Sequence, residues 1–423
     1  MNRRKFITTT AAGTAGAVAA TTLLSTALNA QESGKPAPKQ DPAKIEAMKA
    51  RIKPITDDER SERMERARKL MTENNLDAML MEGSTNLQYY TGVGWGRSER
   101  VFAMLLGRTG EPHWIVPKFE EGRADEQIKK GKVWTWEEYE SPYEHIAQAL
   151  GELGASTGAL GIEETTRYFV TEGIVKTLGS LRLASATPVT AGCRSVKTEH
   201  ELELMQIAND ITKEVFSFSL GFLKDGMKER EFGSVISKLY SEYGVSGGAL
   251  VLFGEASAYP HGMIQDHALH DGQIVLIDGG CTVGGYESDV TRTNVFGKPT
   301  DKMNKVWDIV KQAQTAARDT AKPGVPSEDV DAAARKVIGD AGYGPGYKYF
   351  SHRLGHGIGM DGHEWYYLVK GNTRPLASNN TFSDEPGIYI PGEFGIRLED
   401  DLQITNDGSR LMLPQAKSLE EIF

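Results

Sequence analysis

Residues 274–295 read IVLIDGGCTVGGYESDVTRTNV, and this is the most informative stretch of the chain. Two β-prone runs, Ile274–Asp278 and Tyr286–Val295, are joined by a loop rich in glycine, which predicts a β-hairpin. We expect this hairpin to bring Asp278 and Asp289 side by side at one end. Two carboxylates so close repel each other strongly unless a proton or a cation lies between them. The stretch therefore implies a bound cation.

A second pair of acids occurs near the C-terminus. The segments 382–390 (FSDEPGIYI) and 395–401 (GIRLEDD) flank a four-residue turn, and the predicted hairpin places Glu385 opposite Glu399. Between the two pairs lies HRLGHGIG at 352–359, in which glycines on both sides of the second histidine allow a close backbone approach. Each element alone is compatible with a structural role, but their joint order and spacing indicate a metal site.

The composition excludes several classes of protein. A length of 423 residues predicts two or three domains, and 39% hydrophobic with 25% charged residues is typical of a soluble globular protein. An excess of 58 acidic over 48 basic residues argues against nucleic acid as a partner. Cys193 and Cys281 are the two cysteines of the sequence, and they cannot form a disulfide framework or a thiolate zinc site. A metal must then be held by carboxylates and histidines.

Residues 1–30 are expected to form a twin-arginine signal peptide. The basic triplet RRK at 3–5 precedes an uncharged, mildly hydrophobic stretch over 7–31, and RRKFI resembles a twin-arginine export signal. We expect cleavage after Ala30, which leaves 45 basic and 58 acidic residues and no stable membrane span. The twin-arginine machinery would then deliver the folded protein to the periplasm or the exterior. An uncleaved N-terminal anchor is the alternative.

The remaining chain divides into three parts. Residues 31–56, rich in Lys, Pro, Ala and Gln, are expected to be a linker or an arm that reaches toward a partner subunit. Residues 57–190 alternate short apolar runs with helical stretches, which predicts an α/β domain. Thr198 and Glu201 form a predicted capping box, so a second domain is expected over 194–423. Helices are predicted at 57–74, 143–153, 229–243, 301–321 and 327–341.

The order of five residues resembles the metal-ligand set of the pita-bread metallopeptidases (peptidase family M24), to which methionine aminopeptidase, aminopeptidase P and prolidase belong. These residues are Asp278, Asp289, His356, Glu385 and Glu399. The strings IDGG, SDVTRT, GHGIG, EPGIYI and GIRLEDD are similar to the motifs of that family. EPGIYI and RLEDD resemble aminopeptidase P and prolidase more than methionine aminopeptidase.

The resemblance implies an α+β fold. It covers residues 194–423 well, which would form a pita-bread (creatinase/aminopeptidase) domain of two αβ halves related by a pseudo-twofold axis. Residues 57–190 fit, more loosely, the smaller α/β N-terminal domain of the proline-specific and creatinase-like branch. The resemblance also implies a homodimer.

The same resemblance assigns the ligands to two divalent ions. Asp289 and Glu399 would bridge both ions, Asp278 would complete one, and His356 with Glu385 the other. Four carboxylates and one imidazole form a hard donor set that suits Mn²⁺ best and Co²⁺, Fe²⁺ or Zn²⁺ as alternatives. A metal-activated hydroxide would attack the amide carbon while Glu385 relays the proton to the leaving nitrogen.

Four further residues resemble functional positions of the family. His261 and His363 match an upstream and a downstream histidine that are expected to hydrogen-bond the substrate or the tetrahedral oxyanion. His352 resembles a substrate-binding histidine near the proline pocket, and Arg397 resembles an arginine that braces the site. Glu364 follows His363 at a position where many proline-specific relatives have aspartate.

These roles imply an exopeptidase with a dinuclear metal site that hydrolyses N-terminal Xaa-Pro bonds in peptides or dipeptides. A creatinase-like hydrolase or a metal-dependent lyase on a small non-peptide substrate would share the fold, and a non-catalytic binding module is a further alternative. Creatinase lacks the full metal set, an exported enzyme suits peptide processing, and a binding module would have lost ligands. The presence of all five ligands with His261 and His363 favours the peptidase.

Overall fold

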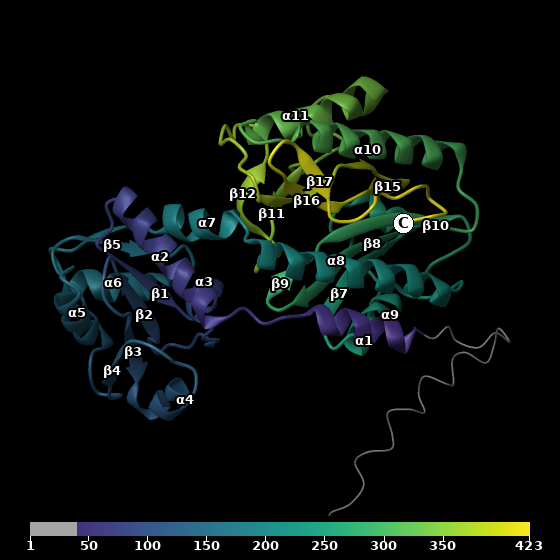
Figure 1. Cartoon of the computed structure of the whole chain (residues 1–423). Coiled ribbons are helices and arrows are strands. Elements are labelled where there is room, and N and C mark those ends of the chain that lie inside the picture. The colour runs from purple at the N-terminus through teal and green to yellow at the C-terminus, as the bar shows by residue number, and fades with distance from the viewer. Residues whose placement is uncertain (1–39) are drawn as a thin grey trace, which may run out of the picture. The chain divides into compact units, whose positions relative to one another are not determined.

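A computed structural model describes residues 40–423 of the chain (Figure 1). The predicted signal peptide at 1–30 and the first part of the predicted linker lie outside the described residues. In the described part, an α/β domain is followed by a larger domain of helices and antiparallel strands. No helix between residues 40 and 423 is long and apolar enough to cross a membrane.

The N-terminal domain is built on a six-stranded mixed sheet with the order β4-β3-β2-β1-β5-β6. The central strand β1 pairs antiparallel with β2 and parallel with β5. The apolar runs of the sequence form β1, β2, β3 and β5, as their composition predicts. The strands are β1 Ala78–Glu82, β2 Ala103–Gly107, β3 His113–Pro117, β4 Lys132–Trp136, β5 Ala159–Ile162 and β6 Arg182–Ser185.

Helices cover both faces of this sheet. Met79 and Met81 of β1 belong to one buried cluster with α2, α3 and α7, whereas Leu80 belongs to another with α5 and α6. Successive side chains of a strand point to opposite faces, so a strand covered on both sides is apolar throughout. The helices are α2 Asp57–Glu73, α3 Thr85–Thr91, α4 Glu121–Asp125, α5 Pro142–Glu152, α6 Tyr168–Thr177 and α7 Thr187–Ser195. The predicted boundary at 190–194 falls inside α7, which packs in the core of the N-terminal domain, so Arg194 belongs to this domain.

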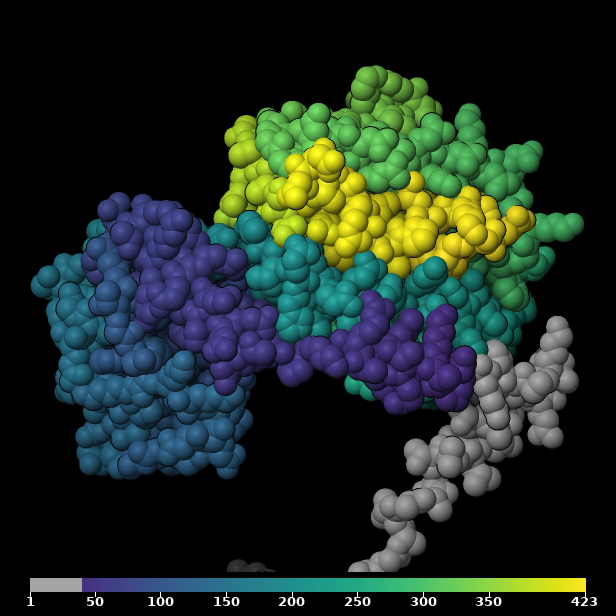
Figure 2. Space-filling view, viewed as in Figure 1, coloured from purple at the N-terminus to yellow at the C-terminus, as the bar shows by residue number. Residues whose placement is uncertain are grey.

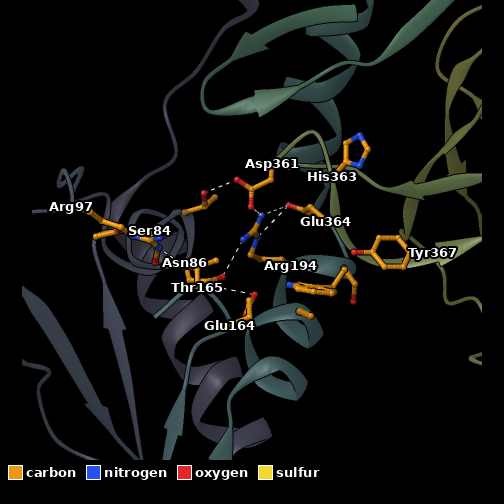
Figure 3. A pocket seen from close by; sticks show the side chains of 15 residues that line it. Ser84, Asn86, Arg97, Glu164, Thr165, Arg194, Asp361, His363, Glu364 and Tyr367 are labelled. Atoms are coloured by element: carbon orange, nitrogen blue, oxygen red, sulfur yellow. Dashed lines mark hydrogen bonds and ion pairs between the residues drawn. The ribbon is translucent and has the colours of Figure 1, made fainter. Parts of the chain in front are cut away.

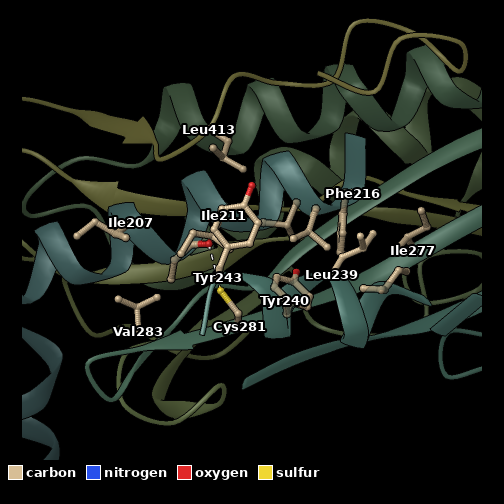
Figure 4. Close-up of a cluster of buried hydrophobic side chains, with 14 of the residues drawn as sticks. Ile207, Ile211, Phe216, Leu239, Tyr240, Tyr243, Ile277, Cys281, Val283 and Leu413 are labelled. Atoms are coloured by element: carbon tan, nitrogen blue, oxygen red, sulfur yellow. Dashed lines mark hydrogen bonds between the residues drawn. The ribbon is translucent and has the colours of Figure 1, made fainter. Parts of the chain in front are cut away.

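The first half of the C-terminal domain packs α8 and α9 against β7, β8 and β10. Thr198 caps α8 in the predicted capping box with Glu201. The core between helices and strands contains Ile211, Phe216 and the free, buried Cys281 (Figure 4). The elements are α8 Glu199–Ser219, α9 Glu229–Glu242, β7 Ser246–Phe253, β8 Gln273–Val283, β9 Tyr286–Glu287 and β10 Val290–Phe296.

The second half repeats this design with α10 and α11 over the sheet β12-β11-β13-β16-β17, and a separate hairpin β14-β15 extends from it. Both halves thus set a helix pair on antiparallel strands. The elements are α10 Asp301–Thr320, α11 Ser327–Ile338, β11 Gly355–Gly357, β12 Glu364–Leu368, β13 Thr381–Asp384, β14 Gly387–Ile390, β15 Phe394–Arg397, β16 Asp400–Ile404 and β17 Ser409–Leu411.

The segment expected to be a linker or arm differs from the prediction. Residues Pro42–Arg51 form the helix α1, and Ile45 is buried in the core of the first half of the C-terminal domain. Arg51 adds ion pairs to Glu203 and Asp210 of α8 at 3.0 and 2.6 Å. In Figure 2 the purple surface of α1 lies against the teal atoms of this domain. The polar composition of this segment is typical of a linker. It gave no sign of α1 because one short helix needs few apolar residues to dock.

Candidate active site

The first predicted hairpin is present, and it brings Asp278 and Asp289 together at one end as predicted. Asp278 of β8 lies opposite Thr291 of β10, not opposite Asp289. Asp289 falls between β9 and β10, and the same register places it opposite Gly280. Because residues two apart in a strand share a face, Asp278, Asp289 and Thr291 all lie on one face of this ladder. The two carboxylates are therefore diagonal neighbours.

The second hairpin brings Glu385 and Glu399 together as predicted. Asp384 pairs with Asp400 at the end of β13 and β16, and Gly387 pairs with Arg397 where β14 and β15 begin the outer part of the hairpin. Both ladders share one register, which sets Glu385 opposite Glu399 in the gap between them. A β-bridge from Thr291 to Glu399 joins this hairpin to the first one.

His356 is supplied by β11, beside β13. A Cβ atom on Gly355 would lie 1.9 Å from the carbonyl oxygen of Ser383, so this close strand approach requires glycine. The imidazole Nδ1 lies 3.0 Å from the carbonyl oxygen of Gly357. Since a carbonyl oxygen only accepts, Nδ1 carries the ring proton and Nε2 presents a lone pair. The Nε2 atom lies 3.4 Å from Glu385 Oε1 and 3.8 Å from Asp289 Oδ2.

Three overlapping groups of ligating atoms occur within residues 40–423, and in each the atoms lie within 4.8 Å of one another. They are Asp278–Asp289–Glu399, His356–Glu385–Glu399 and Asp289–His356–His363. The structure thus brings all five predicted ligands into one cluster. Asp289 and Glu399, the two predicted bridging residues, each occur in two of the groups.

The cluster holds more negative charge than neighbouring cations offset. Burial, followed by repulsion from Asp278, raises the pKa of Asp289 well above its usual value. Burial likewise raises the pKa of Glu385 to about 8 and that of Glu399 well above its usual range. Asp278 is the exception, because Arg397 and Thr291 outweigh the effect of burial and lower its pKa. Without a cation, protons must bind here.

Two further observations fit divalent ions. The single hydroxyl proton of Thr291 cannot serve both Asp278 Oδ1 at 2.8 Å and Glu399 Oε2 at 2.6 Å. The lone pair of His356 faces carboxylate oxygens, which repel it. Burial lowers the pKa of His356 to about 3, so the ring stays neutral and able to ligate. Four carboxylates match the charge of two divalent ions, and the donor set is hard and rich in oxygen.

Arg397 braces the cluster from β15. Its Nη2 donates to Asp278 Oδ2 at 2.6 Å, its Nε to Thr291 Oγ1 at 3.2 Å, and its Nη1 to the Tyr389 hydroxyl at 2.8 Å. Tyr389 in turn lies 2.7 Å from His352 Nε2, and His352 Nδ1 lies 2.8 Å from the carbonyl oxygen of Arg353. A directed chain of hydrogen bonds therefore runs from the metal cluster to His352. The predicted part of His352 and Arg397 in substrate binding stays a prediction.

His363 lies at the mouth of the site. Its ring stacks on that of His356 with a centroid separation of 3.6 Å and an interplanar angle of 13°. Arg353 Nη2 donates to His363 Nδ1 at 3.4 Å, which leaves Nε2 as the protonated nitrogen. His261 is exposed on the loop before β8, and the carbonyl oxygen of the preceding Pro260 accepts from Arg397 Nη1 at 3.1 Å. The two predicted substrate histidines are thus near neighbours of the cluster.

A cavity of about 490 Å³ opens beside His363 (Figure 3). Its wall includes Ser84 and Asn86 of the N-terminal domain and Trp365 and Tyr367 of β12. Figure 3 shows the side chains of Arg194, Asp361 and Glu364 meeting at its floor. The lining of this cavity includes none of the five predicted ligands, and the cavity reaches the ligand cluster through His363, whose ring stacks on His356.

Several residues of the site escaped the sequence reasoning. Thr291, Ser383 and Tyr389 bond the predicted ligands or their brace, and Arg194 and Lys197 bind Glu364. Thr291 could have been found from the hairpin register, because it faces Asp278. Arg194 had no such signal, since it lies 170 positions before Glu364.

The fold and the site define a metal-dependent hydrolase of peptides. Residues 203–406 match the model of metallopeptidase family M24, and residues 63–196 match that of the creatinase/prolidase N-terminal domain. An uncharacterized peptidase of Schizosaccharomyces pombe is 37% identical over 368 residues, which cover 82% of this chain and 79% of the relative. The chain belongs to metallopeptidase family M24, whose members use divalent metal ions.

Two solved structures extend the comparison. Dipeptidase PepE from Mycobacterium ulcerans superposes with a TM-score of 0.80 at 30% identity, covering 88% of this chain and 100% of that chain. A prolidase from Thermococcus sibiricus gives 0.77 at 31% identity, covering 84% and 96%. The comparisons confirm the predicted fold class, an α/β creatinase-type domain followed by a pita-bread domain.

Proposed function

We propose that this M24 peptidase hydrolyses N-terminal Xaa-Pro bonds in peptides or dipeptides. The observation that carries the proposal is the complete cluster of five ligating side chains with His363 stacked on one of them. Solved relatives at about 30% identity support the substrate class, since one is called a prolidase and another an Xaa-Pro dipeptidase from Bacillus anthracis.

We further propose that Asp278, Asp289, His356, Glu385 and Glu399 hold two divalent ions, with Mn²⁺ as the preferred metal because the donors are hard. When bound, such ions lower the pKa of a shared water and polarise the scissile carbonyl. Asp289 and Glu399 would be shared by both ions, because they are the carboxylates that lie in two of the ligand groups. His356 lies in two groups as well, but its one available lone pair can serve a single ion.

Glu385 is the proposed proton carrier. In the metal-free chain burial raises its pKa to about 8, so this side chain is able to hold a proton near neutral pH. Ser383 donates to Oε1 at 3.1 Å and fixes the orientation of the carboxylate. The other oxygen, Oε2, lies 3.7 Å from His352 Nδ1 and would exchange the proton with the leaving nitrogen.

His363 and His261 are the proposed hydrogen-bond donors to the substrate. Arg353 occupies His363 Nδ1, so the Nε2–H of that ring is available to a carbonyl or an oxyanion. His261 is exposed and can donate to the same substrate from the loop before β8. Loss of one such donor typically lowers kcat by about 10²–10³-fold.

A panel of peptides tests the substrate class. The chelated protein is reloaded with Mn²⁺, Co²⁺ or Zn²⁺ and assayed on Xaa-Pro and Xaa-Ala dipeptides and on the matching tripeptides. We expect turnover of the proline series, fastest with Mn²⁺. Equal turnover of the Xaa-Ala series would remove the proline preference. Hydrolysis of a small guanidino compound such as creatine, without peptide hydrolysis, would favour the creatinase-like alternative.

We also retain three proposals about the whole chain, namely export by the twin-arginine machinery, a periplasmic or extracellular location, and a homodimer. Their support is the RRKFI string at the start of the sequence and the resemblance to the proline-specific branch. Replacement of Arg3 and Arg4 by lysine should stop export and processing. Light scattering of the purified protein should give the mass of two chains.

A further inference from the structure

Arg194 lies at the end of α7 and binds both acids that flank His363. Its Nη2 is 2.6 Å from Asp361 Oδ2 and 2.6 Å from Glu364 Oε1, and its Nε is 3.2 Å from the same Glu364 oxygen. The side chains of Arg194 and Glu364 are only 8% and 5% exposed. One guanidinium therefore clamps the short loop before β12 on both sides of its histidine (Figure 3).

Both carboxylate oxygens of Glu364 accept hydrogen bonds from neighbouring groups. Its Oε2 lies 2.9 Å from Lys197 Nζ, and its Oε1 also accepts the backbone N–H of Met360 at 2.9 Å. Although burial opposes ionisation, Lys197 and Arg194 lower the pKa of Glu364 to about 2. The carboxylate is thus committed to holding the loop.

The N-terminal domain completes the clamp through α3. Thr85 Oγ1 donates to Asp361 Oδ1 at 2.6 Å, and Asn86 Oδ1 accepts from Arg194 Nη1 at 3.1 Å. Asn86 is itself fixed, because its Nδ2 donates to Glu163 Oε2 at 2.9 Å. The loop that carries His363 is consequently held by side chains from a different domain.

We propose that Arg194 is a positioning residue for His363. Through Asp361 and Glu364, the end of α7 holds the His363 ring stacked on His356, with its Nε2–H directed at the substrate. The inference rests on the substrate-donor role proposed above for His363. The N-terminal domain would then help to position a catalytic side chain of the same polypeptide. This role also explains why a buried acid follows the histidine.

A control is needed because breaking any buried ion pair destabilises a protein. Arg63 and Glu201 form such a pair at 2.7 Å between α2 and α8, with side chains 6% and 1% exposed. The other hydrogen bonds of Arg63 go to Tyr89 and Tyr286, so none reaches residues 360–364. Arg63→Met therefore breaks an equally buried link between the same domains without releasing the His363 loop.

The experiment compares Arg194→Met with Arg63→Met, each made in the natural protein and in a His363→Ala background. With metal and an Xaa-Pro peptide, Arg194→Met should lower kcat by roughly 10–100-fold and leave KM almost unchanged, as expected for a misplaced group that acts in the transition state. In the His363→Ala background the same substitution should change kcat by less than about threefold. Arg63→Met should stay within about threefold in both backgrounds.

Hydrogen exchange gives a readout that does not depend on activity. Backbone amides of residues 358–366 should exchange faster in Arg194→Met and at the natural rate in Arg63→Met. The inference would be overturned if the loss of kcat caused by Arg194→Met were just as large in the His363→Ala background. Unchanged exchange in this loop would overturn it as well. If Arg194→Met does not fold, Asp361→Asn removes one arm of the clamp and should show the same pattern at smaller size.

Failure of the proposed function would look different. A natural protein that cleaves no Xaa-Pro peptide would remove the substrate assignment, whereas the exchange of residues 358–366 would still decide whether Arg194 holds the loop.

Discussion

The imidazole Nε2 of His356 lies 3.4 Å from Oε1 of Glu385, and both atoms carry lone pairs. The ring proton is on Nδ1, held by the carbonyl oxygen of Gly357, so Nε2 has no proton to donate to the glutamate. Two electron-pair donors at this distance, one from β11 and one from the end of β13, are arranged for a shared cation.

Loss of a ligand should abolish hydrolysis while the fold survives. Asp289→Asn removes the charge of a proposed bridging carboxylate, and His356→Ala removes the only imidazole of the proposed ligand set. We expect kcat/KM to fall by more than about 10²-fold in each variant, with a normal circular dichroism spectrum. Metal content per chain should fall in parallel. Full activity in either variant would contradict the two-metal assignment.

Metal binding should release protons at neutral pH. Burial raises the pKa of Glu385 from 4.5 to about 8 in the metal-free protein, so this group is largely protonated at pH 7. Divalent ions bind the ionised form and displace the proton. Calorimetry of Mn²⁺ binding in buffers of different ionisation enthalpy should detect this release. Binding that is independent of the buffer would contradict it.

The same shift predicts how the stability of the metal-free protein depends on pH. A raised carboxyl pKa favours the protonated folded state, so its stabilising effect is complete below the unfolded value of 4.5 and is lost as the pH rises through about 8. The gap in melting temperature between metal-loaded and metal-free protein should therefore widen between pH 5 and pH 8. Scanning calorimetry across that range measures it.

Thr291 should tune the metal site without ligating. Its hydroxyl contacts Asp278 and Glu399, and Thr291→Val removes these contacts at constant volume. Loss of such a partner typically lowers metal affinity or activity by about 10–100-fold. Thr190→Val is the control, because that buried hydroxyl bonds Glu164 in the N-terminal domain. Equal effects of the two substitutions would contradict a specific role for Thr291.

Gly355→Ala should distort the strand that carries His356. The added methyl group would lie 1.9 Å from the carbonyl oxygen of Ser383, so β11 and β13 must separate. We expect a loss of about 1–3 kcal/mol in the free energy of unfolding and weaker metal binding. Gly151→Ala is the matched control, because it lies in α5 with its nearest neighbour at 3.7 Å. There the helix should gain up to about 1 kcal/mol.

Much of the fold was readable from local sequence. Apolar runs gave β1 and β5 because strands buried on both faces need apolar residues throughout. The capping box at Thr198 marked the start of α8, since its hydrogen bonds join residues three apart. Helix α1 was missed, because its stability comes from docking onto α8 and not from its own pattern of residues.

The candidate site likewise has a part that the sequence predicts and a part that it does not. The spacing of acids, turns and glycines along the chain was enough to predict the two acidic hairpins and the histidine between glycines, because a hairpin brings together residues near its turn. Partners from distant segments became visible only in the folded chain, where Arg397 Nη2 donates to Asp278 and Arg194 reaches Asp361 and Glu364 from the N-terminal domain. Those contacts join residues 119 to 170 positions apart, and packing alone selects such partners.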